Sequence, residues 1–349
     1  MHTSLPRRLA AAVAVAAGLA LALAGCSTSA SPSSTESSSS AGAEAGAFPV
    51  TLDSTLGSTT IESAPKRVVT IGWGSADTVV SLGVVPVGIE KVTYGQDSND
   101  DYPWVSKAIT KMGGTQPETF DVYPDIDMTK LAELNPGLII AVQSGITDKQ
   151  YKTLSALAPT VAYPGKAWLT PWDTQIETIG KALGKPKLAA EKVDEITTRL
   201  AAVKADHPDF SKLTFTYASM GEPGRLAVYL DGDPRVALIK AMGLTESSVM
   251  KSAKADSGSG SYLATLGLEK SDLLDSTDIV FTWYYDKANK AEIDEQPLIA
   301  SIPAIKRGSV VSSTDPQFVM GTTFITPLSV PYAIDEYVPL ITEAASKVG

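Results

Sequence analysis

The sequence has very few of the side chains that most often ligate transition metals. Among its 349 residues there are one cysteine, Cys26, and two histidines, His2 and His207. A single cysteine excludes an intrachain disulfide and any zinc site built on paired thiolates. Because transition metals prefer imidazole and thiolate ligands, we expect no resident metal.

Positive charge is also scarce. The chain has 29 basic and 39 acidic side chains, for a net charge of -10. A nucleic-acid partner requires clustered lysine and arginine, so we expect no nucleic-acid binding. Hydrophobic residues make up 44% of the chain, which is typical of a globular protein and, at this length, of two domains.

Motifs for catalysis are missing as well. The chain contains no G-x-S-x-G sequence, and His207 falls at the end of a predicted helix, where a cation compensates the helix dipole. Two groups of acids fall in turn-rich loops and are predicted to be solvated turn residues. They are Asp97 with Asp100 and Asp101, and Asp231 with Asp233. We therefore predict no catalytic residue and no enzymatic activity.

Residues 1–25 are predicted to be a lipoprotein signal peptide. Arg7 and Arg8 precede an apolar run, Leu9–Ala24, that is shorter than the roughly 20 residues needed to span a membrane. The string Leu23-Ala24-Gly25-Cys26 resembles a bacterial lipobox, which implies acylation of the Cys26 thiol and cleavage before it. The alternative is a plain secretory peptide with an incidental cysteine. Residues 26–47 are serine-rich and are predicted to be a flexible tether.

From Phe48 onward, predicted strands and helices alternate. The apolar run Gly137–Val142 suits a buried parallel strand, and the amphipathic segment Trp172–Leu183 suits a helix that covers a sheet. The class is therefore α/β with mostly parallel sheets. A longer predicted helix, Lys187–Ala205, lies between two such patterns. We expect an N-terminal lobe over 48–184, an interlobe helix over 185–207 and a C-terminal lobe over 208–349.

Aromatic residues cluster just after predicted strands. Ligands of open α/β sheets bind outside the carboxyl ends of the strands, so side chains at these positions are candidates to line a cleft. All five tryptophans lie in or beside such loops. The predicted lining residues are Trp73, Tyr94, Trp104, Trp168, Trp172, Trp283 and Tyr284.

A glycine-rich turn allows a distant alternative. Gly72-Trp73-Gly74-Ser75-Ala76-Asp77 follows a predicted strand, and Glu90 ends the next strand, as in a dinucleotide-binding fold. Asp77 stands where that motif needs a small residue, and Trp73 is bulky for a phosphate turn. A dinucleotide-binding α/β protein is the less favoured reading.

Several segments, taken in order, resemble the class III substrate-binding proteins of ABC importers, and the iron–siderophore branch in particular. One of them, Leu131–Ile140, is similar to a helix–strand segment of that family, with Gly137 in place of the usual aspartate. The others are Pro65–Val69, Ala76-Asp77, Leu82–Gly88, Leu157–Val161, Lys181–Gly184 and Ile302–Gly308.

The resemblance implies two α/β lobes with short central sheets, joined by one long helix, and a ligand cleft between them. It implies a lipid-anchored receptor on the extracytoplasmic face of the cell membrane, a monomer that delivers a ferric siderophore to an ABC permease and its ATPase. Iron would arrive already chelated, so no cofactor is expected. Haem and cobalamin are the alternative ligands; haem would require an axial ligand such as Tyr94 or Tyr284.

Three charged residues are further candidates. Arg225 follows a glycine-rich turn at the start of a predicted second-lobe strand, and we expect it to face the cleft and to donate hydrogen bonds to ligand oxygens. The alternative is an ordinary surface arginine. In this family an acid on each lobe pairs with arginines of the permease. Glu269 stands at the matching place in the second lobe; in the first lobe Thr129 occupies it, and Asp127 is the nearest acid.

Lipidation of Cys26 leads to a direct prediction. Cys26→Ala removes the acylated thiol, so the protein is expected to fold normally but to leave the membrane fraction. Fractionation of cells followed by immunoblotting checks this. A variant that stays in the membrane although its leader is cleaved normally would contradict it.

Overall fold

A five-stranded parallel sheet forms the centre of the first lobe, in the order β5-β4-β3-β6-β7. The structure, a computed structural model, describes residues 42–257 and 262–349. Strand β6 is buried along its whole length, as an apolar strand covered on both faces should be. The elements of this lobe are β1 (Val50–Ser54), β2 (Gly57–Ile61), β3 (Val68–Thr70), α1 (Ser75–Ser81), β4 (Gly88–Glu90), α2 (Pro103–Lys111), β5 (Glu118–Phe120), α3 (Met128–Glu133), β6 (Leu138–Ala141), α4 (Asp148–Leu157), β7 (Thr160–Ala162) and α5 (Trp172–Ala182).

The second lobe has a mixed sheet in the order β11-β9-β8-β12-β13, with β10 paired to β8. Strands β8, β10, β12 and β13 are parallel, whereas β9 is antiparallel to β8 and to β11. Its elements are η1 (Pro208–Lys212), β8 (Thr214–Ser219), β9 (Ala227–Tyr229), α7 (Pro234–Ala241), β10 (Thr245–Glu246), α8 (Ser248–Ser252), β11 (Leu263–Thr265), η2 (Leu268–Leu274), β12 (Ile279–Trp283), α9 (Lys287–Asp294), α10 (Pro297–Ser301), α11 (Pro303–Arg307), β13 (Val310–Ser313), α12 (Pro316–Gly321) and α13 (Ser329–Ala345).

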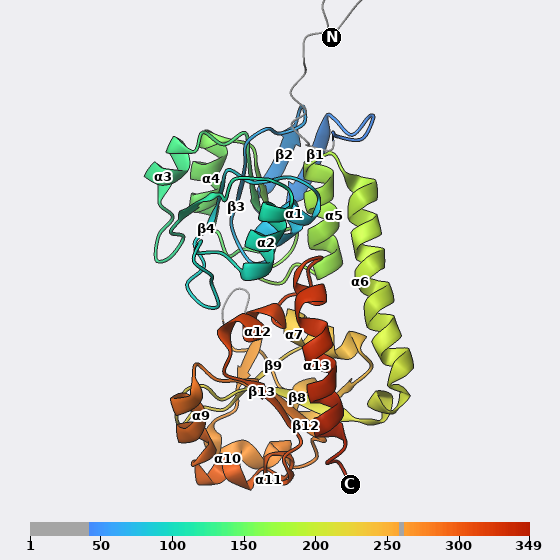
Figure 1. Cartoon of the computed structure of the whole chain (residues 1–349). Helices are drawn as coiled ribbons and strands as arrows, with labels where there is room; N and C mark the ends of the chain where they lie inside the picture. The colour runs from blue at the N-terminus through green and yellow to red at the C-terminus, as the bar shows by residue number, and fades with distance from the viewer. Residues whose placement is uncertain (1–41, 258–261) are drawn as a thin grey trace, which may run out of the picture. The chain divides into compact units, whose positions relative to one another are not determined.

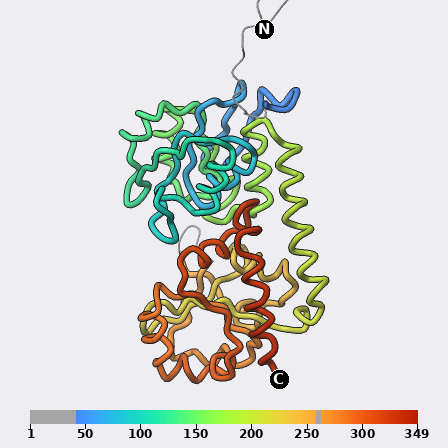
Figure 2. Tube along the Cα trace, viewed as in Figure 1, coloured from blue at the N-terminus to red at the C-terminus, as the bar shows by residue number. Residues whose placement is uncertain are grey.

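One long helix, α6 (Pro186–Asp206), carries the chain from the first lobe to the second (Figures 1 and 2). Pro186 occupies its first turn, where the missing N–H costs no hydrogen bond. Its 21 residues span about 31 Å. Helix α6 packs along α5, and buried side chains of both helices join one continuous core with the second-lobe strands.

A second link between the lobes is the segment 322–328, between α12 and α13. Phe324 is buried among Val80, Trp104 and Val105 of the first lobe. The carboxylate of Asp77, at the start of α1, accepts hydrogen bonds from both lobes: Trp104 Nε1 and Thr326 Oγ1 donate to Oδ2 at 2.8 and 2.6 Å, and the Leu328 amide donates to Oδ1 at 3.1 Å. The lobes are therefore fastened beside the first-lobe helices as well as through α6.

The predicted α/β class, with two lobes and one bridging helix, is confirmed. The stretch Gln296–Lys306, whose sequence pattern predicts a single helix, instead forms two short helices, α10 and α11. Pro303 lacks the N–H that would continue the first helix, and Ile302 adopts an extended ψ of 123° before it. Strand β5 and helix α2, which both contribute to the region described below, were not predicted. Within the described residues, no helix is long and apolar enough to cross a membrane.

Burial raises the pKa of Asp77 from 3.8 to about 7, although its hydrogen bonds oppose the shift. Between these two values the folded chain binds more protons than the unfolded chain, so this group's contribution to stability falls as pH rises. We expect the Tm to fall by several degrees from pH 5 to pH 8, and Asp77→Asn to flatten that slope.

Calorimetry across this pH range measures the slope, and Asp53→Asn, at an exposed position on β1, is the matched control. An unchanged slope in Asp77→Asn together with a flattened slope in Asp53→Asn would contradict the assignment.

A cavity between the lobes as the candidate binding site

A cavity of about 420 Å³ lies where the two lobes meet, and both lobes line it. This volume is in the range of small-molecule sites. First-lobe residues come from the loops that follow β3, β4 and β5, where parallel strands end at a common edge of the sheet. The second lobe contributes the end of β12, the start of α7 and the segment from Val319 to Phe324.

The glycine-rich turn after β3 is part of this wall. Gly72 has a φ of 90°, and a Cβ there would lie 2.2 Å from the Gln143 carbonyl oxygen, so only glycine fits. Its amide donates to Glu90 Oε2 at 2.6 Å. A carboxylate therefore occupies the amide that a phosphate would need, which is evidence against the dinucleotide alternative. Burial raises the pKa of Glu90, and the hydrogen bond from Gly72 opposes this.

Aromatic rings from both lobes form most of the wall. Trp73 lies 5.3 Å from Trp168 and 5.7 Å from Phe324 between ring centroids. On the second-lobe side, Trp283 lies 6.1 Å from Tyr94 and 5.0 Å from Tyr285. These offset and edge-on arrangements provide apolar surface with polar rims, suited to a bulky ligand with both apolar and polar faces.

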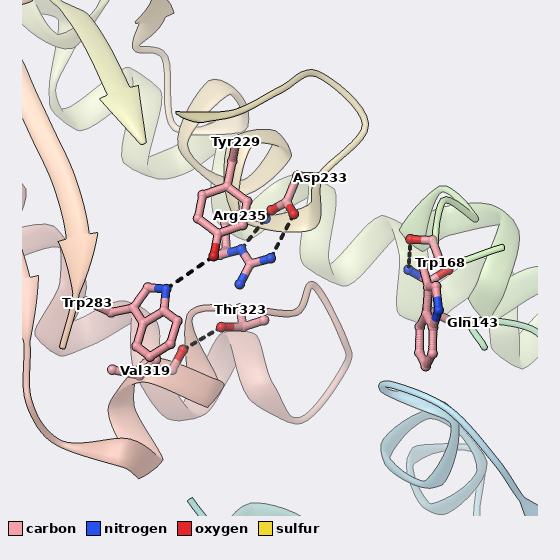
Figure 3. Close-up of polar contacts among 8 residues, drawn as sticks. All are labelled: Gln143, Trp168, Tyr229, Asp233, Arg235, Trp283, Val319 and Thr323. Carbon is pink, nitrogen blue, oxygen red and sulfur yellow. Dashed lines mark hydrogen bonds and ion pairs between the residues drawn. The ribbon is translucent and has the colours of Figure 1, made fainter. Parts of the chain in front are cut away.

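Trp168 stands behind this wall rather than on it. Its carbonyl accepts a hydrogen bond from Gln143 Nε2 at 2.9 Å (Figure 3). Its ring is tilted by 49° against that of Trp73 and stacks, at 6.4 Å, on the exposed Tyr123; both of these residues line the cavity. Trp168 therefore supports two lining rings.

Arg235, in the first turn of α7, is the second-lobe cation of the cavity (Figure 3). Its Nε and Nη2 donate to the two carboxylate oxygens of Asp233 at 2.9 and 2.8 Å, leaving Nη1 outside this pair. The guanidinium lies over the Tyr229 ring, 3.9 Å from its centroid, and Tyr229 Oη accepts from Trp283 Nε1 at 3.3 Å. A buried ion pair therefore fixes the arginine beside the aromatic wall.

Asp101 is the unexpected acid of the first-lobe wall. It is 2% exposed rather than solvated; Oδ1 accepts from the Tyr102 amide at 2.7 Å, and Oδ2 is buried with no hydrogen-bond partner among the described residues. Burial, together with the nearby charges of Asp97 and Asp77, raises its pKa to about 7. The prediction of solvated turn residues was wrong for Asp101, and also for the fully buried Asp233.

Of the predicted lining residues, the structure brings Trp73, Tyr94 and Trp283 to the cavity. Trp104 does not line it: the ring stacks on Tyr102 at 4.8 Å and bonds Asp77 inside the lobe contact. Trp172 begins α5 and packs against the core. Tyr284 is buried, and its hydroxyl donates to Asp294 Oδ1 at 3.2 Å, away from the cavity.

Arg225 also lies outside the cavity lining. Its Nη1 pairs with Glu222 at 3.0 Å on the surface. The cavity arginine is Arg235, which follows an Asp-Pro helix start at Asp233-Pro234. The Asp-Pro pair by itself predicts the beginning of a helix. The residues beside Arg235, Tyr229 and Trp283, come from two separate strands, so nothing in the local sequence indicated that Arg235 would line the cavity.

Two α/β lobes, one bridging helix and a ring-lined cavity between the lobes define a solute-binding protein. The chain belongs to the periplasmic binding protein family, whose model matches residues 68–316. This is a family of binding proteins and not of enzymes.

Among known structures, the chain is similar to PiaA of Streptococcus pneumoniae TIGR4, solved in complex with ferrichrome. The two are 29% identical with a TM-score of 0.77, over 86% of this chain and 100% of that one. Among curated proteins, it is 31% identical to the Fe(3+)-citrate-binding protein YfmC of Bacillus subtilis, over 44% of this chain and 45% of that protein. The petrobactin-binding protein YclQ of the same organism is 23% identical over 72% and 76%. The chain spans about half the length of the first curated relatives that it matches.

Proposed function

We propose that this protein is the lipid-anchored, extracytoplasmic receptor that binds a ferric siderophore between its lobes and delivers it to an ABC permease and its ATPase. The observation that carries the proposal is the cavity itself, in which aromatic rings of both lobes surround one fixed arginine. Its relative PiaA, matched over its full length, holds ferrichrome.

The chemistry of the wall supports a chelate as ligand. A siderophore complex is compact, with an apolar rim and oxygen atoms around the metal. Trp73, Trp283 and Phe324 offer apolar contact, and Arg235 offers a charge-assisted donor for those oxygens. Iron enters already coordinated, so the protein needs no resident cofactor. Among the described residues, no group of three or more His, Cys, Asp and Glu side chains could hold a metal ion.

Haem is a weaker candidate because none of the side chains expected as its axial ligand, His207, Tyr94 and Tyr284, is well suited to bind its iron in this cavity. His207 stacks on Phe210 at the end of α6 and does not line the cavity. Tyr94 does line it, but burial raises the pKa of its hydroxyl, which disfavours the phenolate that would bind iron. The hydroxyl of Tyr284 is bonded to Asp294.

The anchor, the leader and the predicted tether up to residue 41 fall outside the described residues. Residues 42–47 are described and contact the first lobe: the Glu44 amide donates to the Gly184 carbonyl at 2.7 Å, and Glu44 Oε1 accepts from the Lys187 amide at 2.8 Å. The assignment of the leader and the anchor, and with it the location on the extracytoplasmic face of the membrane, rests on the sequence around Cys26. The monomeric state rests on the resemblance to the family, and the lobe boundaries at 184 and 208 rest on the two predicted α/β patterns that flank the long helix. The fractionation of Cys26→Ala tests the anchor, and gel filtration of the mature chain tests the monomer.

A titration with ferrichrome, haem and cobalamin tests the proposed ligand class. We expect ferrichrome to raise the Tm and to quench tryptophan fluorescence, because Trp73 and Trp283 line the cavity. Arg235→Lys keeps a cation opposite Asp233 but loses the planar donor fork, so it should weaken ferrichrome binding about tenfold.

Arg225→Ala is the matched control, since this arginine is paired at the surface, and it should bind as the unmodified protein does. Tight binding of haem or cobalamin with no response to ferrichrome would overturn the proposal. Equal weakening by both arginine variants would remove Arg235 from the site.

Two acids are proposed to guide docking to the permease. Glu269 is exposed at the start of η2, which precedes β12; Asp127 caps α3, which precedes β6. Strand β12 lies between β8 and the edge strand β13, and β6 lies between β3 and the edge strand β7, so the two acids belong to equivalent connections, although Thr129 and not Asp127 occupies the place that matches Glu269. Asp127 Oδ1 already accepts from the Lys130 amide at 2.9 Å, which leaves it less free than Glu269.

We therefore predict an asymmetric dock in which Glu269 matters more than Asp127. Glu269→Gln should reduce uptake and the salt sensitivity of association with the permease while ligand affinity stays unchanged, since rim charges act mainly on encounter. Asp127→Asn keeps the helix cap and is the matched variant. Uptake and association are measured for both; normal uptake by Glu269→Gln together with a loss in Asp127→Asn would reverse the assignment.

A further inference from the structure

The two cations that line the cavity are both already paired. The guanidinium of Arg235 faces the carboxylate of Asp233 in a two-point ion pair in which both side chains are buried. Lys91 Nζ lies 3.2 Å from Asp100 Oδ2 at a half-exposed position. An anionic ligand would meet two ion pairs and not two free cations, so its own charge would gain little from either.

The acids that line the cavity are not paired in this way. Asp77, Glu90, Asp101 and Asp121 line it, and no ion pair to any of these four occurs among the described residues. Glu90 and Asp77 accept hydrogen bonds from neutral groups only. Burial already raises the pKa of Asp77, Glu90 and Asp101, and a ligand anion nearby would raise these pKa values further, so an anion in the cavity would meet either repulsion from a carboxylate or the cost of protonating one.

Asp101 adds a specific vacant acceptor. Its Oδ2 is buried and has no hydrogen-bond partner among the described residues, although the residue lines the cavity. A buried acceptor without a donor is costly, and a ligand N–H or ammonium group that reached it would remove that cost. Because a hydrogen bond to a carboxylate is strongest when the donor is charged, an ammonium gains most.

We infer that the cavity selects uncharged or positively charged ferric complexes, such as iron trihydroxamates, over polyanionic ones, and that Asp101 is a specificity residue that accepts a hydrogen bond from a donor on the ligand. This inference deepens the proposed function and rests on it. Arg235, whose charge is balanced by Asp233, then donates a hydrogen bond to an uncharged ligand oxygen. The acids of the first-lobe wall disfavour ligands that carry excess negative charge.

Three ferric probes of different charge test the inference by fluorescence titration of the mature chain. Ferrichrome is uncharged, ferrioxamine B carries a free ammonium, and ferric citrate is anionic. We expect both hydroxamates to bind at least about tenfold more tightly than ferric citrate. Added salt should weaken ferrioxamine B binding and leave ferrichrome binding unchanged.

The variant Asp101→Asn keeps the shape of the side chain and removes its charge. It should weaken ferrioxamine B binding about tenfold, change ferrichrome binding less than threefold, and narrow the gap to ferric citrate. Asp148→Asn, which changes an exposed acid in the first turn of α4, is the matched control and should leave all three affinities as they are. Circular dichroism verifies that each variant is folded, and the unmodified chain's ranking decides the charge preference in any case.

The outcomes separate the two levels of the argument. Ferric citrate binding as tightly as the hydroxamates would overturn the charge preference and leave the proposed function standing. An Asp101→Asn variant that loses equal affinity for ferrichrome and ferrioxamine B, or none for either, would overturn the role of Asp101. If no ferric complex binds while the protein is folded, the proposed function fails and the inference with it.

Discussion

The carboxylate of Asp77 is the contact on which the cavity depends. It takes donors from Trp104 in the first lobe and from Thr326 and Leu328 in the second, in a place from which water is excluded. Burying an acid costs less free energy when its acceptors are satisfied, so the hydrogen bonds to Asp77 favour the return of the segment 322–328 to the first lobe. That return brings Phe324 to Trp73 and closes one side of the cavity.

The charged side chains of the two cavity walls are paired in different ways. On the second-lobe side, Asp233 neutralises Arg235, and the guanidinium is held flat over Tyr229, so an arginine can be buried at a modest cost in free energy. On the first-lobe side, Glu90 accepts a hydrogen bond from the Gly72 amide, whereas Oδ2 of Asp101 has no donor among the described residues. The charged groups of the second-lobe wall are therefore paired within the protein, whereas Asp101 on the first-lobe wall can still accept a hydrogen bond from a ligand.

Both lobes bring residues to the cavity from the ends of strands. Parallel strands end at one edge of each sheet; the loops that leave this edge carry Trp73, Tyr94 and Tyr123 in the first lobe, and β12 ends with Trp283 in the second. Helix α6 and the 322–328 segment then set the two edges against each other. The positions of the strand ends therefore determine where the cavity forms, and the side chains at those ends determine what it can bind.

The sequence by itself determined the class, the long bridging helix and the loops after strands, because these follow from local periodicity, proline placement and apolar runs. It also pointed to Trp73, Tyr94 and Trp283, which the structure places on the cavity, since a position at the end of a strand is a local property. It could not distinguish Arg235 from Arg225, or a buried Asp101 from a solvated one. Those differences depend on neighbours that are remote in the chain, as Leu328 is from Asp77, and only tertiary packing decides which polar groups lose their water.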